Sequence, residues 1–116
     1  MEAESTRAQK IARQIQRDMS EILQKEASAL ARGTMVSVTV VRMSPDLSLA
    51  KIYLSVFPFD KHAEILENIK KNAWSLRMSL AKRMKNQIKS IPEVAFFLDD
   101  SMEYADNIDS ILKRSL

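Results

Sequence analysis

The sequence predicts a two-layer α+β domain in which helices cover a small three-stranded sheet. Apolar residues recur every three or four positions over residues 6–32 and again over 60–88, which is the period of a helix. They alternate with other residues over 34–43, 48–57 and 93–99, which is the period of a strand. Amphipathic helices beside so few strands have to bury their apolar sides on one face of the sheet.

The first two strands are expected to form an antiparallel hairpin. Residues 34–43 and 48–57 are separated only by Ser44-Pro45-Asp46, a turn with proline at its favourable second position. Each strand has one predicted apolar face, formed by Val36, Val38 and Val40 in the first strand and by Ala50, Ile52, Leu54 and Val56 in the second.

The central segment fits either one long helix or two helices broken near residues 72–75. The apolar spacing does not decide between them, although a slow drift of the apolar stripe around the helix favours a bend. The stripe consists of Ile65, Leu66, Ile69, Ala73, Leu76, Leu80, Met84 and Ile88.

The last third of the chain predicts a strand followed by a helix. Pro92 ends the helical segment, and residues 93–99 form the third strand. Asp100 and Glu103 have the spacing of a capping box at the start of a C-terminal helix. The apolar residues of this helix are Met102, Ala105, Ile108, Ile111 and Leu112.

Length and composition exclude most catalytic classes. The chain of 116 residues makes one domain, residues 1–116, and has no cysteine, one histidine and one glycine. A disulfide scaffold, a thiol nucleophile, a histidine-based triad or metal site, and a glycine-rich nucleotide loop are therefore not expected. No apolar run approaches the roughly 20 residues of a membrane helix, and the charged N-terminus is not a secretion signal. We expect a cytoplasmic monomer with no cofactor and no membrane partner.

The charges are unevenly distributed, although the formal net charge is only +3. Residues 70–89 contain seven basic residues and no acidic one, whereas residues 93–109 contain six acidic residues and no basic one. A further basic row on the first helix, at spacings of three and four, occupies one helix face. The basic residues are Lys70, Lys71, Arg77, Lys82, Arg83, Lys85 and Lys89 in the central segment, and Lys10, Arg13 and Arg17 in the row.

This layout leaves two interpretations open. The basic residues suit contact with the phosphates of a nucleic acid. Alternatively, the basic face is only solvated, and the protein is an interaction adaptor whose acidic C-terminal helix docks on a basic partner. Trp74, inside the basic segment, either stacks on a base or packs at the bend between two helices, and we favour packing.

Four stretches of the chain resemble the bacterial ribosome-binding factor A family. They are the first helix (RAQKIARQIQRDMSEILQKE), the hairpin (VVRMSPDLSLAKIYLSVF), the basic segment LRMSLAKRM and the ending IPEVAFFLDDSMEYADNID. The resemblance covers nearly the whole chain in the same order. It implies a KH-like fold of the type II order, helix-strand-strand-helix-kink-helix-strand plus a C-terminal helix.

The resemblance also implies a non-enzymatic assembly factor. Such a factor binds the immature small (30S) ribosomal subunit and its 16S rRNA, and supports late maturation and processing of the rRNA ends. Among the basic residues, Arg77, Lys82 and Arg83 match the family's basic helix, and Lys70, Lys71 and Lys85 flank them. Arg7, Lys10 and Arg13 on the first helix are further candidates. Arg42 and Lys51 beside the hairpin turn either contact RNA or border the sheet.

At one position the chain departs from the family pattern. Family members have an Ala-x-Gly kink between the two central helices. The matching residues here are Asn72-Ala73-Trp74 or, with a shift of one residue, Ala73-Trp74-Ser75. Neither contains glycine, so a bend at this point would have to come from packing of Trp74 rather than from a flexible residue.

Overall fold

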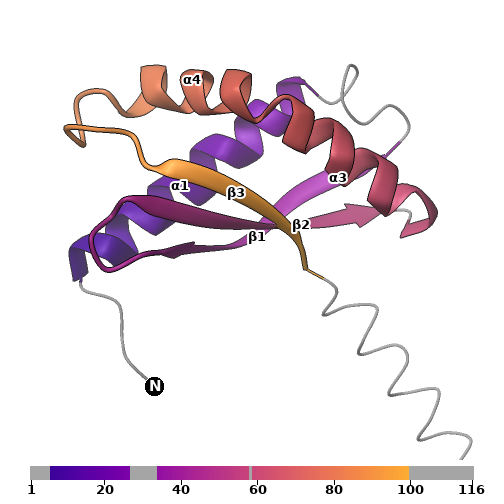
Figure 1. Cartoon of the computed structure of the whole chain (residues 1–116), viewed down its shortest axis with the longest axis horizontal. Helices are drawn as coiled ribbons and strands as arrows, with labels where there is room; N and C mark the ends of the chain where they lie inside the picture. The colour runs from indigo at the N-terminus through magenta and orange to yellow at the C-terminus, as the bar shows by residue number, and fades with distance from the viewer. Residues whose placement is uncertain (1–5, 27–33, 58, 100–116) are drawn as a thin grey trace, which may run out of the picture.

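The chain folds into the predicted two layers, with helices on one face of a three-stranded sheet (Figure 1). The computed structural model describes residues 6–26, 34–57 and 59–99. The sheet order is β1-β2-β3, with β1 and β2 antiparallel and β2 and β3 parallel. The elements are α1 (Thr6–Lys25), β1 (Met35–Met43), β2 (Leu49–Phe57), the 3-10 turn η1 (Phe59–Lys61), α3 (His62–Lys71), α4 (Ala73–Met84) and β3 (Glu93–Leu98).

The hairpin forms as predicted, but β1 does not alternate regularly along its length. The pairing with β2 shifts between Val38 and Val40, which leaves Thr39 as an extra residue in a β-bulge. After the bulge the buried positions are Val41 and Met43. The prediction that Val40 shares the buried face of Val36 and Val38 is therefore wrong, because one extra residue reverses the faces of the residues that follow.

Two side chains hold the bulge in place. The Gln16 side-chain amide of α1 donates to the Thr39 carbonyl at 3.1 Å. The Thr39 hydroxyl donates to the Asp99 carboxylate at 2.6 Å and lies 3.3 Å from the Tyr53 carbonyl oxygen. The bulge thus connects the helical layer to β1 and, across β2, to the end of β3.

The central segment consists of two helices, and the break falls at Asn72. The Asn72 backbone N–H donates to the carbonyls of Asn68 and Ile69, and its side-chain amide donates to the Asn68 carbonyl at 2.8 Å. One residue with φ −103° and ψ 14° therefore redirects the helix without glycine. Ala73, Trp74 and Ser75 form the first turn of α4.

Helix α4 ends four residues before the predicted apolar stripe does. Its last residue is Met84, and Ile88 lies in the following turn, half-buried against the core. The Met84 carbonyl accepts from the backbone N–H groups of Gln87 and Ile88. This turn keeps Ile88 close to the apolar side of the helix, so spacing alone did not reveal where the helix ends.

The core lies between the helical layer and the covered face of the sheet. The predicted inward residues Ala50, Ile52, Leu54 and Val56 of β2 are all buried. They meet Ile15 and Met19 of α1, Ile69 of α3, and Leu80 and Met84 of α4, none of which has measurable solvent exposure. The predicted C-terminal helix and residues 27–32 of the predicted first helix lie outside the described residues.

Candidate nucleic-acid interface

The basic residues of the central segment separate into two groups by what their side chains contact. The two arginines, Arg77 and Arg83, are partly buried and bonded to other parts of the fold. The lysine side chains are exposed and form no hydrogen bond or ion pair with the residues that the structure describes; these lysines are Lys70, Lys71, Lys82, Lys85 and Lys89.

Arg77 attaches α4 to the segment that leads into β3. Its Nε donates to the Pro92 carbonyl at 3.0 Å, and its Nη2 donates to the Ile91 carbonyl at 2.8 Å. Nη2 also lies 3.7 Å from the Glu93 carboxylate, which is largely exposed. The planar guanidinium can satisfy two backbone carbonyls at once, which a lysine ammonium on its flexible stem does less well. Arg77 therefore has a structural role.

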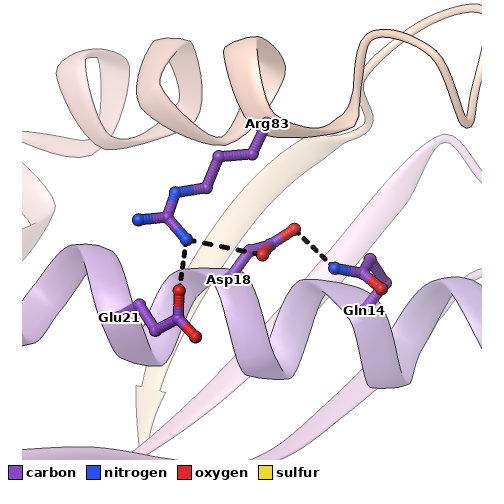
Figure 2. Close-up of polar contacts among 4 residues, drawn as sticks. All are labelled: Gln14, Asp18, Glu21 and Arg83. Carbon is purple, nitrogen blue, oxygen red and sulfur yellow. Dashed lines mark hydrogen bonds and ion pairs between the residues drawn. The ribbon is translucent and has the colours of Figure 1, made fainter.

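Arg83 attaches α4 to α1 (Figure 2). Its Nη1 donates to the Glu21 carboxylate at 2.5 Å and lies 3.5 Å from Oδ1 of Asp18. The Asp18 side chain is only 9% exposed, and its other oxygen accepts from the Gln14 amide at 2.9 Å. The hydrogen bond between Arg83 and Glu21 lowers the pKa of the Glu21 carboxyl and raises the pKa of the Arg83 guanidinium. Arg83 is thus the cation that accompanies a nearly buried carboxylate.

Trp74 does not pack at the bend. It is 73% exposed, so the favoured prediction of a packing role is wrong, and Asn72 makes the hydrogen bonds at the break instead. Trp74, Met78 and Lys82 are spaced four residues apart on α4, and Lys85 follows three residues later in helical conformation. Residues at these spacings share one side of a helix. We call Trp74, Met78, Lys82 and Lys85 the outer face of α4.

The candidates on the first helix lie in the same layer as this outer face. Lys10, Arg13 and Arg17 are exposed on α1, and Arg83 fixes α1 beside α4. The apolar side of each helix packs against the core, so the exposed cations of both helices lie on the solvent side of the helical layer. The helical layer therefore combines basic residues that lie about seventy positions apart in the sequence.

Arg42 and Lys51 lie elsewhere, on the sheet face that the helices leave open. They are direct cross-strand partners in the β1–β2 pair, and both are exposed. Their neighbours Val41, Ala50 and Ile52 point to the covered face. The structure thus does not gather all of the predicted basic residues on one surface.

The open sheet face also carries an aromatic pair that the sequence reasoning did not single out. Tyr53 of β2 and Phe97 of β3 stack with ring centroids 5.4 Å apart. They pair across the parallel strands, and Phe97 is 39% exposed. The sequence could have indicated that both aromatic residues lie on the open face, because each alternates with buried positions of its strand.

A cavity of about 240 Å³ lies at the hairpin-turn end of the molecule. Its lining includes Arg7 at the start of α1 and Lys89 before β3, together with Asp46 and Ser48 of the turn. Leu47, between these two turn residues, has a φ of 63°. A leucine in the left-handed region indicates a turn that is held firmly by its surroundings.

Two further kinds of feature are absent from the described residues. No group of three or more histidine, cysteine, aspartate or glutamate side chains there is arranged to hold a metal ion. None of the helices in those ranges has the length and apolar character that a membrane span requires.

The fold and the exposed lysines define a class: small α+β domains of the type II KH-like order with a basic helical layer. Within this class the chain belongs to the ribosome-binding factor A family, whose family model matches residues 7–112. Ribosome-binding factor A of Cytophaga hutchinsonii is 44% identical over 96% of this chain and 84% of that protein. The Flavobacterium psychrophilum protein of the same name is 41% identical over 94% of this chain and 85% of that protein.

Solved structures of the same name share the fold. The crystal structure of ribosome-binding factor A from Thermus thermophilus has a TM-score of 0.65 at 21% identity, covering 78% of this chain and 94% of that one. A solution structure from Thermotoga maritima, described as a putative ribosome-binding factor A, has a TM-score of 0.66 at 22% identity, with coverages of 84% and 91%. A Thermus thermophilus homology model, fitted into a cryo-EM map of the factor's complex with 30S, has a TM-score of 0.62 at 24% identity, with coverages of 77% and 91%. These likenesses confirm the predicted fold class.

Proposed function

We propose that this protein binds the immature small ribosomal subunit in the cytoplasm as a monomer and acts there as a non-enzymatic assembly factor. It contacts 16S rRNA phosphates with the exposed lysines of its helical layer, and it supports late maturation and processing of the rRNA ends. Membership of the ribosome-binding factor A family supports this proposal, as does the related Thermus thermophilus protein fitted into a map of its 30S complex.

The observation that carries the proposal is the separation of lysines from arginines around α4. Four lysine side chains are exposed and unpaired among the described residues: Lys70, Lys71, Lys82 and Lys85. Residues 70–89 contain no acidic residue that could balance their charge. Like charges close together on helices cost stability when no anion is present. Phosphates that bind there would remove this cost and release counterions from the RNA.

Arg77 and Arg83 take part in this interface through position rather than through charge. They hold α4 against β3 and α1, and so fix where the lysines point. Variants of these two residues would change the fold and the interface together. The lysines are therefore the cleaner test.

The first test is co-sedimentation of the purified protein with immature and mature small subunits over a series of salt concentrations. We expect preferential binding to immature subunits that weakens steeply with salt. Replacing Lys70, Lys71, Lys82 and Lys85 with glutamine should reduce the slope of log affinity against log salt by about 3, since each phosphate contact contributes about 0.7 to 0.9. A variant with glutamine at Lys25 and Lys61, which lie outside the basic segment 70–89, provides the control for charge loss elsewhere.

Two results would contradict the proposal. Binding that does not depend on salt, or that survives the four substitutions unchanged, would show that the helical lysines do not contact phosphates. Absence of binding to either subunit at every salt concentration would favour the adaptor interpretation. The maturation role is tested separately: in cells that lack the endogenous factor, the four-glutamine variant should leave precursor 16S rRNA unprocessed while the parent protein restores processing.

A further inference from the structure

We propose that Trp74 is a stacking platform for an unpaired RNA base, at the centre of the lysine-rich part of the helical layer. This inference rests on the proposed function and makes it more specific: the RNA partner is single-stranded at this point of contact. The residues involved are Trp74 itself and the lysines on either side of it in α3 and α4.

The first step is the exposure of Trp74. An indole buries a large apolar surface when it packs, so a tryptophan that is 73% exposed is unusual for a residue without a surface function. Trp74 lies in the first turn of α4, where a residue could point either toward the core or away from it. Ala73 and Leu76 supply the inward contacts of that turn, and Trp74 is left outside.

The second step is the set of charges around the indole. Lys82 and Lys85 follow Trp74 along the outer face of α4, at helical spacings that place them on the same side of the helix. Lys70 and Lys71 are the last two residues of α3, directly before the break at Asn72 that leads into Trp74. All four lysines are exposed.

The third step compares possible occupants of this surface. A flat aromatic ring that is bordered by cations suits a ligand with a π face and negative charge beside it, which describes a nucleotide in single-stranded RNA. A protein hot spot is usually bordered by further apolar residues. Met35 and Phe57 fit that description, because these two exposed apolar residues are cross-strand partners in the sheet and so lie next to each other. Among the described residues, Met78, at 39% exposure, is the exposed large apolar side chain that shares the outer face of α4 with Trp74.

The experiment uses the fact that Trp74 is the single tryptophan of the chain. Its fluorescence is recorded while the full-length protein is titrated with a short single-stranded RNA of mixed sequence, and then with the blunt duplex of the same strand. We expect strong quenching by the single strand and much weaker quenching by the duplex, whose bases are already stacked on one another.

The second measurement is the affinity of variants for immature subunits by co-sedimentation. Trp74→Ala should weaken binding by about 5- to 150-fold, the range for loss of one base–aromatic stack, with an unchanged salt slope. Trp74→Phe should recover most of the affinity. Met35→Ala, at a similarly exposed apolar residue on the sheet, should behave like the parent. Circular dichroism melting should be the same for all variants, because none of these side chains is buried.

The outcomes separate this inference from the proposed function. If the lysine variants lose salt-dependent binding but Trp74→Ala binds like the parent, the proposed function stands and the stacking inference is overturned. If Trp74→Ala weakens binding to subunits while neither RNA quenches the fluorescence, Trp74 contacts a ribosomal protein and the inference is again overturned. If nothing binds to subunits or RNA, both fail.

Discussion

Arginine and lysine have different roles in this molecule, although both count equally in the charge of the sequence. The guanidinium of Arg77 reaches two neighbouring carbonyls, and that of Arg83 reaches two carboxylates of α1. A planar group with several donors in fixed directions suits such contacts, whereas an ammonium is a compact and strongly hydrated point charge. The sequence revealed where the cations cluster but not which of them bond internally, because their partners lie elsewhere in the chain.

Replacement of Arg83 and of its neighbour Lys82 should therefore have unequal effects on stability. Arg83→Ala leaves the nearly buried Asp18 carboxylate without its cation, which lowers the free energy of unfolding. Lys82→Ala removes the same charge from an exposed position and should stay within about 0.5 kcal/mol of the parent. Urea denaturation of both variants measures the difference. Equal midpoints would contradict the structural role of Arg83.

The turn of the hairpin allows a prediction about pH. Oδ1 of Asp46 accepts from the hydroxyls of Ser48 and Ser44 at 2.7 and 2.8 Å, and from the Ser48 backbone N–H at 3.1 Å. These hydrogen bonds, the Ser48 hydroxyl first, lower the pKa of Asp46 from 3.8 to about 2. The charged form is favoured in the folded state, so the stabilising contribution is complete above pH 3.8 and is lost as the pH falls toward 2.

A carboxyl titration by NMR tests this prediction. Ser48→Ala should raise the pKa of Asp46 toward 3.8 and reduce the loss of stability over the same acid range. Ser55→Ala, on β2 and remote from the turn, serves as the control. A pKa near 3.8 for Asp46 in the parent protein would show that the serine hydrogen bonds do not form in solution.

At the scale of the elements, the strands and helices could be predicted because each has a regular apolar period of its own. The exceptions are positions where tertiary contacts override the period. Thr39 is bulged because Gln16 and Asp99, from α1 and the end of β3, bond to it. The break at Asn72 was one of two predicted alternatives, and the spacing left it open since both helices bury the same stripe.

The bulge makes a prediction about stability. Thr39→Val keeps the shape of the side chain but removes the hydroxyl that donates to Asp99, so we expect a loss of about 1 kcal/mol in the free energy of unfolding. Ser37→Ala, at an exposed position two residues earlier on β1, should change stability by no more than about 0.5 kcal/mol. Chemical denaturation compares the two variants. If Thr39→Val leaves the free energy of unfolding unchanged, the Thr39 hydroxyl bonds equally well to water in the unfolded chain.

At the scale of the whole molecule, the sequence identified the composition of the candidate site but not its division between two faces. The helical period of α1 placed Lys10, Arg13 and Arg17 on one face, and all three are exposed in the structure. In α4 the lysine is exposed, whereas the two arginines bond to other parts of the fold. The sequence could not show that Arg42 and Lys51 lie on the opposite face of the sheet from the helical lysines. That placement depends on which face the helices cover, which is a property of the tertiary packing.

The Arg42–Lys51 pair determines whether the proposed interface extends beyond the helical layer. Two cations directly opposite each other on neighbouring strands destabilise the sheet slightly, unless an anion lies between them. We expect Arg42→Gln and Lys51→Gln each to leave the free energy of unfolding unchanged or slightly raised. Each should also reduce the salt slope of binding to immature subunits by about 0.7 to 0.9, the contribution of one phosphate contact. Denaturation and co-sedimentation of the same preparations provide both values. If stability rises while the slope stays that of the parent, the sheet face does not contact RNA, and binding is confined to the helical layer that carries Trp74 and the lysines of α3 and α4.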